Sequence, residues 1–390
     1  MANYKYLIIG AGMTADAAAR GIRELDPDGE IVMIGSDHNP PYNRPPLTKG
    51  LWKGKPLESI WRRTQELSVE LHLGRTARSI DPDNKVVRDD QGVNYPYEKL
   101  LLATGGTPRR LSFGGEDIIY YRTLDDYHLL HELSSRVDHF GVIGGGFIGS
   151  EITAALTMNG KKVTMFFPDA GIGRHMYPPE LSDYLNTFFR QKGVEIISGV
   201  NVKDLQKHDG SYHLVTDHGD KIHVNGVIAG IGIQPNVELA QAAGLKVGNG
   251  IVVDDLLLTS HPDIFAAGDV AEFSNLTLGK RQRIEHEDNS NNMGKQAGRN
   301  MAGANEPYRH LSYFFSDLFE LGYVAVGELD PRLETFVDWN IKFQKGVIYY
   351  LAGGRVRGVL LWNVWDSVPK ARALIAEPGP FTAADLKGRL

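Results

Sequence analysis

Two glycine-rich turns, each placed between a short apolar strand and a helix, constrain this 390-residue chain more than any other feature. The first turn has Gly10, Gly12 and Ala15 in the pattern G-x-G-x-x-A, directly after the apolar residues 6–9. In such a turn the first glycine permits a tight bend, the second lets a phosphate approach the backbone, and the third small residue keeps the helix close to the strand. The N-terminus of a helix from residue 13 to about residue 25 would then face a pyrophosphate.

The second turn has the full G-x-G-x-x-G at Gly144, Gly146 and Gly149. One such match is weak evidence, because glycine-rich turns also arise from packing alone. Two matches in the same strand, turn and helix context predict that the chain binds two dinucleotides. The stretches 101–108 and 226–236 are also alike, since each is an apolar strand followed by glycines and a proline, and this favours an internal duplication.

The strand after each turn should end in an acid that bonds the adenosine ribose. The first of these strands is followed by Ser36, so the next residue, Asp37, is the candidate. After the second turn the candidate is Asp169, whose charge would repel a 2′-phosphate and therefore favours NADH over NADPH. Arg174 and His175 follow closely enough in the sequence to keep NADPH open.

A proline-rich loop over residues 40–49 carries two cations, Arg44 and Lys49. Proline fixes the backbone and so lowers the entropy lost when these cations are held against a cofactor. The alternative is a rigid surface turn whose charges are solvated.

Another apolar strand ends in Gly268 and Asp269. An acid at the C-terminal end of a parallel strand is placed for a ligand hydroxyl, and the alternative is a helix N-cap. Glu285 and His286 open a predicted helix, and a lone histidine in that position is more often a cap or packing residue than a catalyst.

The chain contains no cysteine, which excludes disulfide scaffolds, thiolate metal sites, thiol nucleophiles and redox chemistry stored in a cysteine pair. We predict no metal site. A net charge of −6 disfavours non-specific nucleic-acid binding. Without a basic leader or an apolar run of about 18 residues, we expect no secretion signal, no transmembrane segment and a cytoplasmic location.

The order of the motifs GAGMTA, PPYNRPPLTK, ATGGTP, GGGFIGSE, GIGIQPN, FAAGDVAEF and FFSDL resembles that of the glutathione-reductase-type flavoproteins without a redox disulfide. These include ferredoxin, putidaredoxin and rubredoxin reductases and the apoptosis-inducing factors. The likeness covers nearly the whole chain, and residues 167–169, 283–286 and 313–318 favour the apoptosis-inducing-factor branch.

The resemblance implies an α/β fold with two Rossmann-like, three-layer dinucleotide-binding domains and a small α+β C-terminal domain. The FAD-binding domain would be discontinuous, at 1–108 and 234–305, with the NAD-binding domain at 109–233 and the interface domain at 306–390. In this last domain Trp339, Trp362 and Trp365 are expected in the core, with an interface role as the alternative.

The resemblance also implies that Lys49 lies near the reactive nitrogen of the flavin and pairs with Glu151. A cation there favours the reduced, anionic flavin, and the glutamate avoids an unpaired buried charge. Phe315 matches an aromatic position near the flavin at which this branch commonly has tryptophan. The residues expected to contact FAD or NAD are Gly10, Gly12, Ala15, Asp37, Arg44, Lys49, Ala103, Thr104, Gly105, Gly144, Gly146, Gly149, Asp169, Gly232, Gly268, Asp269, Glu285, His286 and Phe315.

The activity implied is that of an NAD(P)H-dependent FAD oxidoreductase that passes electrons from NADH to an external acceptor. The first candidate acceptor is a small iron–sulfur protein of the ferredoxin type, or a rubredoxin. The alternative is an NADH-binding redox sensor or assembly protein with slow turnover. Quinone reduction at a membrane is disfavoured, because residues 381–390 are too short and mixed for an interfacial helix. The acceptor and the oligomeric state, a homodimer included, stay open.

Overall fold

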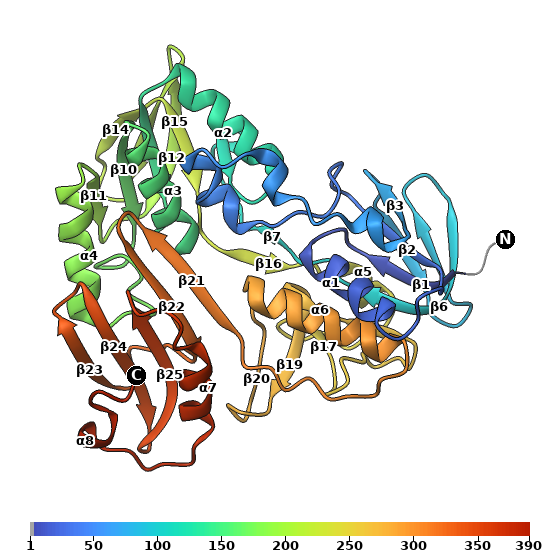
Figure 1. Cartoon of the computed structure of the whole chain (residues 1–390). Coiled ribbons are helices and arrows are strands. Elements are labelled where there is room, and N and C mark those ends of the chain that lie inside the picture. The colour runs from blue at the N-terminus through green and yellow to red at the C-terminus, as the bar shows by residue number, and fades with distance from the viewer. Residues whose placement is uncertain (1–3) are drawn as a thin grey trace. The chain divides into compact units, whose positions relative to one another are not determined.

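The computed structural model describes residues 4–390, which divide into two compact units (Figure 1). Unit 1 contains the chain up to Arg44 together with Leu57–Thr107 and Gln234–Ser312; unit 2 contains Pro45–Pro56, Pro108–Ile233 and Tyr313–Leu390. Residues 1–3, with which the expected domain 1–108 begins, lie outside the described residues. The three-domain division by function remains a prediction, and the segment with Lys49 groups with unit 2.

Unit 1 is built on a mixed sheet with the strand order β3-β2-β1-β6-β5-β4, in which β18 pairs with the C-terminal residues 100–102 of β6. The strands that run parallel are β1 (Tyr4–Ile9), β2 (Ile31–Gly35), β3 (Val69–Leu73), β6 (Asn94–Leu102) and β18 (Ile264–Ala266). The antiparallel extension consists of β4 (Ala77–Asp81) and β5 (Val86–Asp89). Strands β1, β2 and β18 are nearly continuous apolar runs, as expected for strands covered on both faces, whereas β3 and the first half of β6 contain polar and partly exposed residues.

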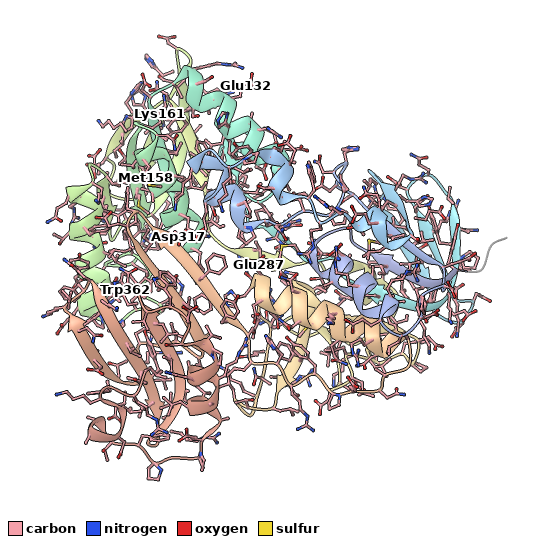
Figure 2. The ribbon with its side chains drawn as sticks, in the orientation of Figure 1. Glu132, Met158, Lys161, Glu287, Asp317 and Trp362 are labelled. Atoms are coloured by element: carbon pink, nitrogen blue, oxygen red, sulfur yellow. The ribbon has the colours of Figure 1, made fainter. Side chains whose placement is uncertain are left out.

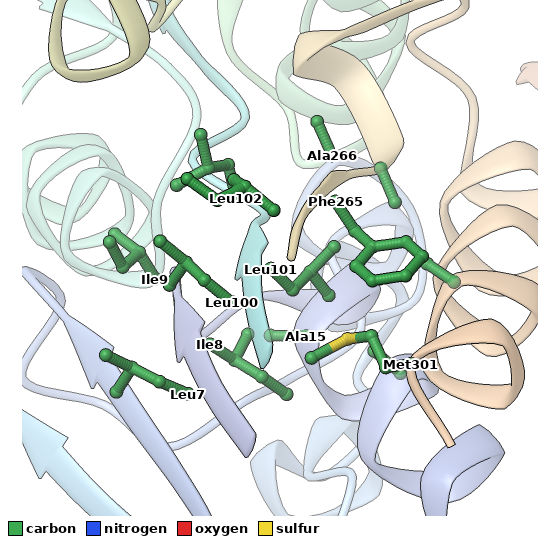
Figure 3. Packing of buried hydrophobic residues seen from close by; sticks show 14 of the residues in the cluster. Leu7, Ile8, Ile9, Ala15, Leu100, Leu101, Leu102, Phe265, Ala266 and Met301 are labelled. Atoms are coloured by element: carbon green, nitrogen blue, oxygen red, sulfur yellow. The ribbon is translucent and has the colours of Figure 1, made fainter. Parts of the chain in front are cut away.

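Two helices of unit 1, α1 (Met13–Arg23) and α6 (Glu287–Met301), pack together at backbone contact distance. A Cβ added at Gly294 or Gly298 of α6 would overlap a carbonyl oxygen of α1, so only glycine allows this approach. Side chains of β1, β6 and β18 pack against Ala15 of α1 and Met301 of α6 (Figure 3). This core fixes the strand ends and the helix N-terminus on which the first glycine turn depends.

Unit 2 contains a second parallel sheet, with the strand order β11-β10-β9-β15-β8. Its strands are β8 (Ile118–Tyr120), β9 (His139–Ile143), β10 (Lys162–Phe167), β11 (Glu195–Ser198) and β15 (Gly226–Ala229). The helices of this part are α2 (Leu124–Arg136), α3 (Phe147–Met158) and α4 (Pro179–Gln191). A small antiparallel sheet follows, formed by β12 (Val202–His208), β13 (Ser211–Thr216) and β14 (Lys221–Val224).

The C-terminal part of unit 2 is an antiparallel sheet with the order β21-β22-β25-β24-β23. Its elements are β21 (Tyr313–Leu318), β22 (Leu321–Gly327), β23 (Glu334–Ile341), β24 (Lys345–Ala352), β25 (Arg355–Trp362), α7 (Val368–Ala376) and α8 (Ala383–Leu386). Gly353 and Gly354, both with positive φ, form the tight turn between β24 and β25, as a Gly-Gly pair between two strand-like stretches indicates.

The three tryptophans of this part differ in burial. Trp362 is fully buried in the sheet (Figure 2) and Trp339 is partly buried. Trp365 is 52% exposed, so the expectation that it lies in the core was wrong. Its ring edge instead covers Gly322, where a Cβ would collide with it.

The remaining short elements are β7 (Gly106–Pro108), β16 (Ile233–Pro235), α5 (Glu238–Ala242), β17 (Ile251–Val252), β19 (Ala271–Asn275) and β20 (Lys280–Gln282). None of the helices in the described part of the chain has the length and apolar character that crossing a bilayer demands.

Candidate cofactor and redox site

The first glycine turn joins β1 to α1, and its two glycines have different roles. Gly10 has a φ of +115°, and an added Cβ would overlap the carbonyl oxygen of Ala103 at the end of β6. Gly12 has an extended backbone that any residue can adopt, and a Cβ there would meet no atom of the described chain within 4 Å. Packing therefore requires Gly10, whereas Gly12 leaves an open space in front of the N-terminus of α1. Ala15 is fully buried, as the fingerprint requires.

The second turn, between β9 and α3, repeats these relations inside unit 2. Gly144 has a φ of +120°, and a Cβ would overlap the carbonyl oxygen of Gly230 at the end of β15. Gly146 faces open space, with no described atom within 4 Å of an added Cβ. Gly149 admits no larger residue, because its Cβ would overlap the carbonyl oxygen of Gly144. The same geometry in both turns supports the expected internal duplication.

The two candidate ribose acids lie at the C-terminal ends of β2 and β10. The carboxylate of Asp37 accepts hydrogen bonds from the backbone N–H of Asn39 at 2.9 Å and from the hydroxyl of Tyr42 at 3.2 Å, which fix its position. Asp169 is exposed. Of the two residues that kept NADPH open, Arg174 lies 3.5 Å from the carboxylate of Asp183, and His175 is exposed.

Three further residues that were expected to contact a cofactor lie near the start of α6. Asp269 lies within the turn after β18, where its carboxylate accepts a hydrogen bond from Ser290 of α6 at 3.2 Å. Glu285 forms an ion pair with Arg283 at 2.5 Å. His286 occupies the N-cap position of α6, and the surrounding protein lowers its pKa to about 4 by desolvation, although part of the ring surface stays accessible. The ring is therefore neutral at physiological pH.

The other predicted contact residues follow strands or precede helices. Ala103 donates its N–H to Ile9 at 2.8 Å, and the hydroxyl of Thr104 donates to the carbonyl oxygen of Asn236 at 2.8 Å. Gly105, Gly232 and Gly268 all have positive φ, which explains glycine at these positions. The backbone N–H of Arg44 lies 3.4 Å from the sulfur of Met13 at the start of α1.

In unit 2, Lys49 and Glu151 form the buried ion pair that the resemblance implied. Their side chains are 13% and 5% exposed, and the Nζ atom lies 2.7 Å from a carboxylate oxygen. Two hydroxyls complete the shell of the carboxylate, those of Thr48 and Ser316, each donating at 2.6 Å. The same Nζ lies 5.2 Å from the ring centre of Phe315. Sequence reasoning did not single out Thr48 or Ser316.

The surroundings of this pair keep both charges in place. Glu151 lies on α3, and Lys49 follows a short helical turn whose Leu47 carbonyl accepts hydrogen bonds from Trp52 and Tyr121. Burial raises the pKa of Tyr323 far above its ordinary value, and the nearby carboxylate of Glu151 adds to the effect. Its phenol therefore stays protonated, and the ion pair lies in a buried environment in which the two charges face each other.

Residues 4–294 match the family model of the pyridine nucleotide-disulphide oxidoreductases. The chain belongs to this family. Residues 297–342 and 337–377 match the model described as apoptosis-inducing factor, mitochondrion-associated, C-terminal. The resemblance drawn from the motifs and the α/β fold class are both confirmed.

Two relatives illustrate the range of the family. The ferredoxin–NAD(+) reductase component of the anthranilate 1,2-dioxygenase system of Burkholderia cepacia is 34% identical over 97% of both chains. Apoptosis-inducing factor 1, mitochondrial, of Dictyostelium discoideum is 33% identical over 95% of this chain and 78% of that protein. Among solved structures, the covalent putidaredoxin reductase–putidaredoxin complex matches with a TM-score of 0.90 at 29% identity, covering 96% of this chain and 94% of the other.

Members of this oxidoreductase family use FAD and NAD(H), which confirms both expected cofactors. The residues present fit them, because Gly12 and Gly146 leave space at two helix N-termini that the packing of the chain does not explain. Despite the family name, this member has no cysteine and so no redox disulfide. Within residues 4–390, no cluster of three or more metal-binding side chains occurs.

Proposed function

We propose that this protein is an NADH-dependent FAD reductase that delivers electrons to a small iron–sulfur protein of the ferredoxin type. The observation that carries the proposal is the full-length match to a ferredoxin–NAD(+) reductase component, in a chain that has no thiol to receive electrons. Electrons from NADH must therefore leave the chain through an external acceptor.

In this proposal, unit 1 binds FAD and unit 2 binds NADH. The turn at Gly10 and Gly12 binds the FAD pyrophosphate, and the turn at Gly144 and Gly146 binds that of NADH. Bound FAD supplies a two-electron acceptor that can release its electrons singly. Lys49 contributes positive charge to the flavin, and Glu151 holds its ammonium group in one position. The protein thus contributes positioning and electrostatics without acid–base chemistry.

The remaining contact residues are proposed to assist these two turns. Asp37 would bond the FAD ribose, Asp269 the ribityl or pyrophosphate portion, and Asp169 the NADH ribose. Phe315 would flank the flavin beside Lys49. The division into FAD-binding, NAD-binding and interface domains and a cytoplasmic location belong to the same proposal.

The proposal is tested with the purified protein and one acceptor. We expect a yellow protein whose flavin absorbance bleaches on anaerobic addition of NADH and returns when an oxidised [2Fe–2S] ferredoxin is added. Coupled reduction of cytochrome c through that ferredoxin gives the turnover rate. Colourless protein that takes up no FAD on reconstitution would overturn the proposal.

A second function is favoured by the match to an apoptosis-inducing factor and to its C-terminal model. In this alternative the protein is a slow NADH-binding redox sensor that changes its oligomeric state or partner. Steady-state kinetics and size-exclusion chromatography separate the two functions. Negligible turnover with ferredoxin, together with a persistent NADH-induced dimer, would support the sensor.

A further inference from the structure

Helix α1 contains a fully buried carboxylate, Asp16, directly after the last position of the glycine fingerprint. The pattern G-x-G-x-x-A has no need of an acid there. The carboxylate accepts hydrogen bonds from Arg20 Nε at 2.9 Å, Arg62 Nε at 2.7 Å and Thr64 Oγ1 at 2.7 Å. A buried charge persists only when it is paired and its lone pairs are satisfied, and this shell meets both conditions.

Arg62 extends this cluster away from the helix. Its Nη1 atom donates to the side-chain oxygen of Asn43 at 2.7 Å, while its Nε atom donates to Asp16. The side chain is only 12% exposed, so it is held along its length. The guanidinium of Arg62 therefore connects α1 to the loop formed by residues 37–44.

The same loop is fastened through its backbone. Asn43 donates its N–H to Ile60 at 2.8 Å, and Arg62 donates its N–H to Pro41 at 3.0 Å. Tyr42 forms an antiparallel bridge with Trp61. Residues 41–43 and 60–62 thus form a short ribbon. Two hydrogen bonds attach this ribbon to α1: that from the Arg62 side chain to Asp16, and that from Arg20 Nη2 to the carbonyl oxygen of Arg62 at 2.6 Å.

The loop formed by residues 37–44 has a predicted cofactor-binding residue at each end. At one end the hydroxyl of Tyr42 holds the carboxylate of Asp37 at 3.2 Å. At the other end Arg44 follows Asn43 directly and has its N–H against Met13. A shift of residues 41–43 relative to α1 would therefore move the hydroxyl of Tyr42 away from Asp37 and displace Arg44 from Met13.

We propose that Asp16 and Arg62 are positioning residues for FAD. They hold residues 37–44 in place before the cofactor arrives, so that binding does not have to order the loop. This inference rests on the proposed function, because it presumes that the first turn holds FAD. It adds to the fingerprint two residues that touch no cofactor and act through the loop.

The test compares two arginines that both fasten α1 to residues of the same region. Arg62→Met removes the side-chain hydrogen bonds from Arg62 to Asp16 and Asn43, while Asp16 keeps Arg20 and Thr64 as partners. Arg23→Met is the matched control, because Arg23 donates to the carbonyl oxygens of Leu67 and Ser68 and so secures the other end of α1. The apoproteins are titrated with FAD and followed by quenching of flavin fluorescence.

We expect the dissociation constant for FAD to rise about tenfold in Arg62→Met, since ordering even one or two side chains on binding costs about that factor. In Arg23→Met it should stay within about twofold, even if both variants lose similar stability. Hydrogen exchange of the apoproteins provides the second readout. The amides of Asn43 and Arg62 should lose protection only when the side-chain hydrogen bonds of Arg62 are removed.

Two more variants distinguish the loss of these hydrogen bonds from misfolding or a general loss of packing. Arg62→Lys keeps the charge but cannot serve Asp16 and Asn43 at once, so it should raise the dissociation constant as Arg62→Met does. Asn43→Ala removes only the hydrogen bond from Arg62 to Asn43 and should do the same with little loss of stability. Equal FAD affinity in Arg62→Met and wild type would refute the inference alone, whereas a wild-type protein that binds no FAD would refute the proposed function.

Discussion

Replacing Lys49 by methionine is the sharpest test of the buried ion pair in unit 2. The substitution keeps the length of the side chain but removes its charge, so Glu151 would retain only the hydroxyls of Thr48 and Ser316. The pair is shielded from water on both sides, with 13% and 5% exposure. Solvent can therefore do little to compensate the lone carboxylate.

The magnitude follows from the geometry. At the 2.7 Å separation found here, and with an effective dielectric constant of about 20, the Coulomb attraction is roughly 6 kcal/mol before desolvation. Measured losses on breaking one side of a buried pair are about 3–5 kcal/mol. The two remaining hydroxyl donors place the expected loss for Lys49→Met at the lower end, about 3 kcal/mol.

The assay is a double-mutant cycle in urea with Lys49→Met, Glu151→Gln and the combined variant. We expect a coupling energy of about 2–3 kcal/mol, because the combined variant buries no unpaired charge. The pair Lys53 and Asp317 is the control in the same unit, with 44% and 38% exposure and a separation of 3.4 Å. Its coupling should stay below about 1 kcal/mol.

The same variant reports on function. Stopped-flow reduction by NADH should be at least about tenfold slower in Lys49→Met, while the FAD content is retained, because a preorganised charge is lost. A coupling energy no larger than that of the surface pair would refute the electrostatic reasoning. Reduction at the wild-type rate would remove Lys49 from the mechanism.

The other predictions concern single positions. Gly12→Ala should leave the urea midpoint nearly unchanged and abolish FAD uptake, and Gly146→Ala should do the same for NADH binding measured by fluorescence; a large loss of stability in either would show that the open space is not the reason for glycine. Because burial lowers the pKa of His286 from 6.5 to about 4, the unfolded state takes up a proton first as the pH falls. Relative to His286→Asn, the wild type should lose about 3 kcal/mol of stability between pH 6.5 and 4, and equal pH dependence of urea unfolding would contradict this. Asp169→Ala should lower the ratio of kcat/KM for NADH to that for NADPH, and an unchanged ratio would exclude this acid from coenzyme selection.

The glycine turns could be predicted from the sequence because the apolar strand and the glycines of each pattern lie within about a dozen consecutive positions. The distant carbonyl groups of Ala103 and Gly230, which also require glycine at positions 10 and 144, could not. Apolar or alternating patterns in the sequence likewise indicate strands at residues 69–73, 162–167 and 221–224, and β3, β10 and β14 have these bounds. Helix α2 was missed, although Thr123 and Asp126 form a capping box at its start. Strand β12 was also missed, since most of its residues are polar and partly or fully exposed.

The shell around Glu151 shows where sequence reasoning ends. Thr48 lies 103 positions and Ser316 lies 165 positions away from it along the chain, so no local pattern connects them. The ion pair with Lys49 was predicted only because the resemblance implied it. Hydroxyl groups are common on any surface, and only packing shows which of them donates to a buried acid.

The way the two units alternate along the chain has a consequence for biosynthesis. Between residues 4 and 390 the chain passes from one unit to the other at five places, and the sheet of unit 1 lacks β18 until residue 266 has been made. Helix α6, which packs on α1, is complete only at Met301. On the ribosome the first nucleotide fold therefore starts earliest and closes late, after the parallel sheet of unit 2, which ends at Ala229, has emerged.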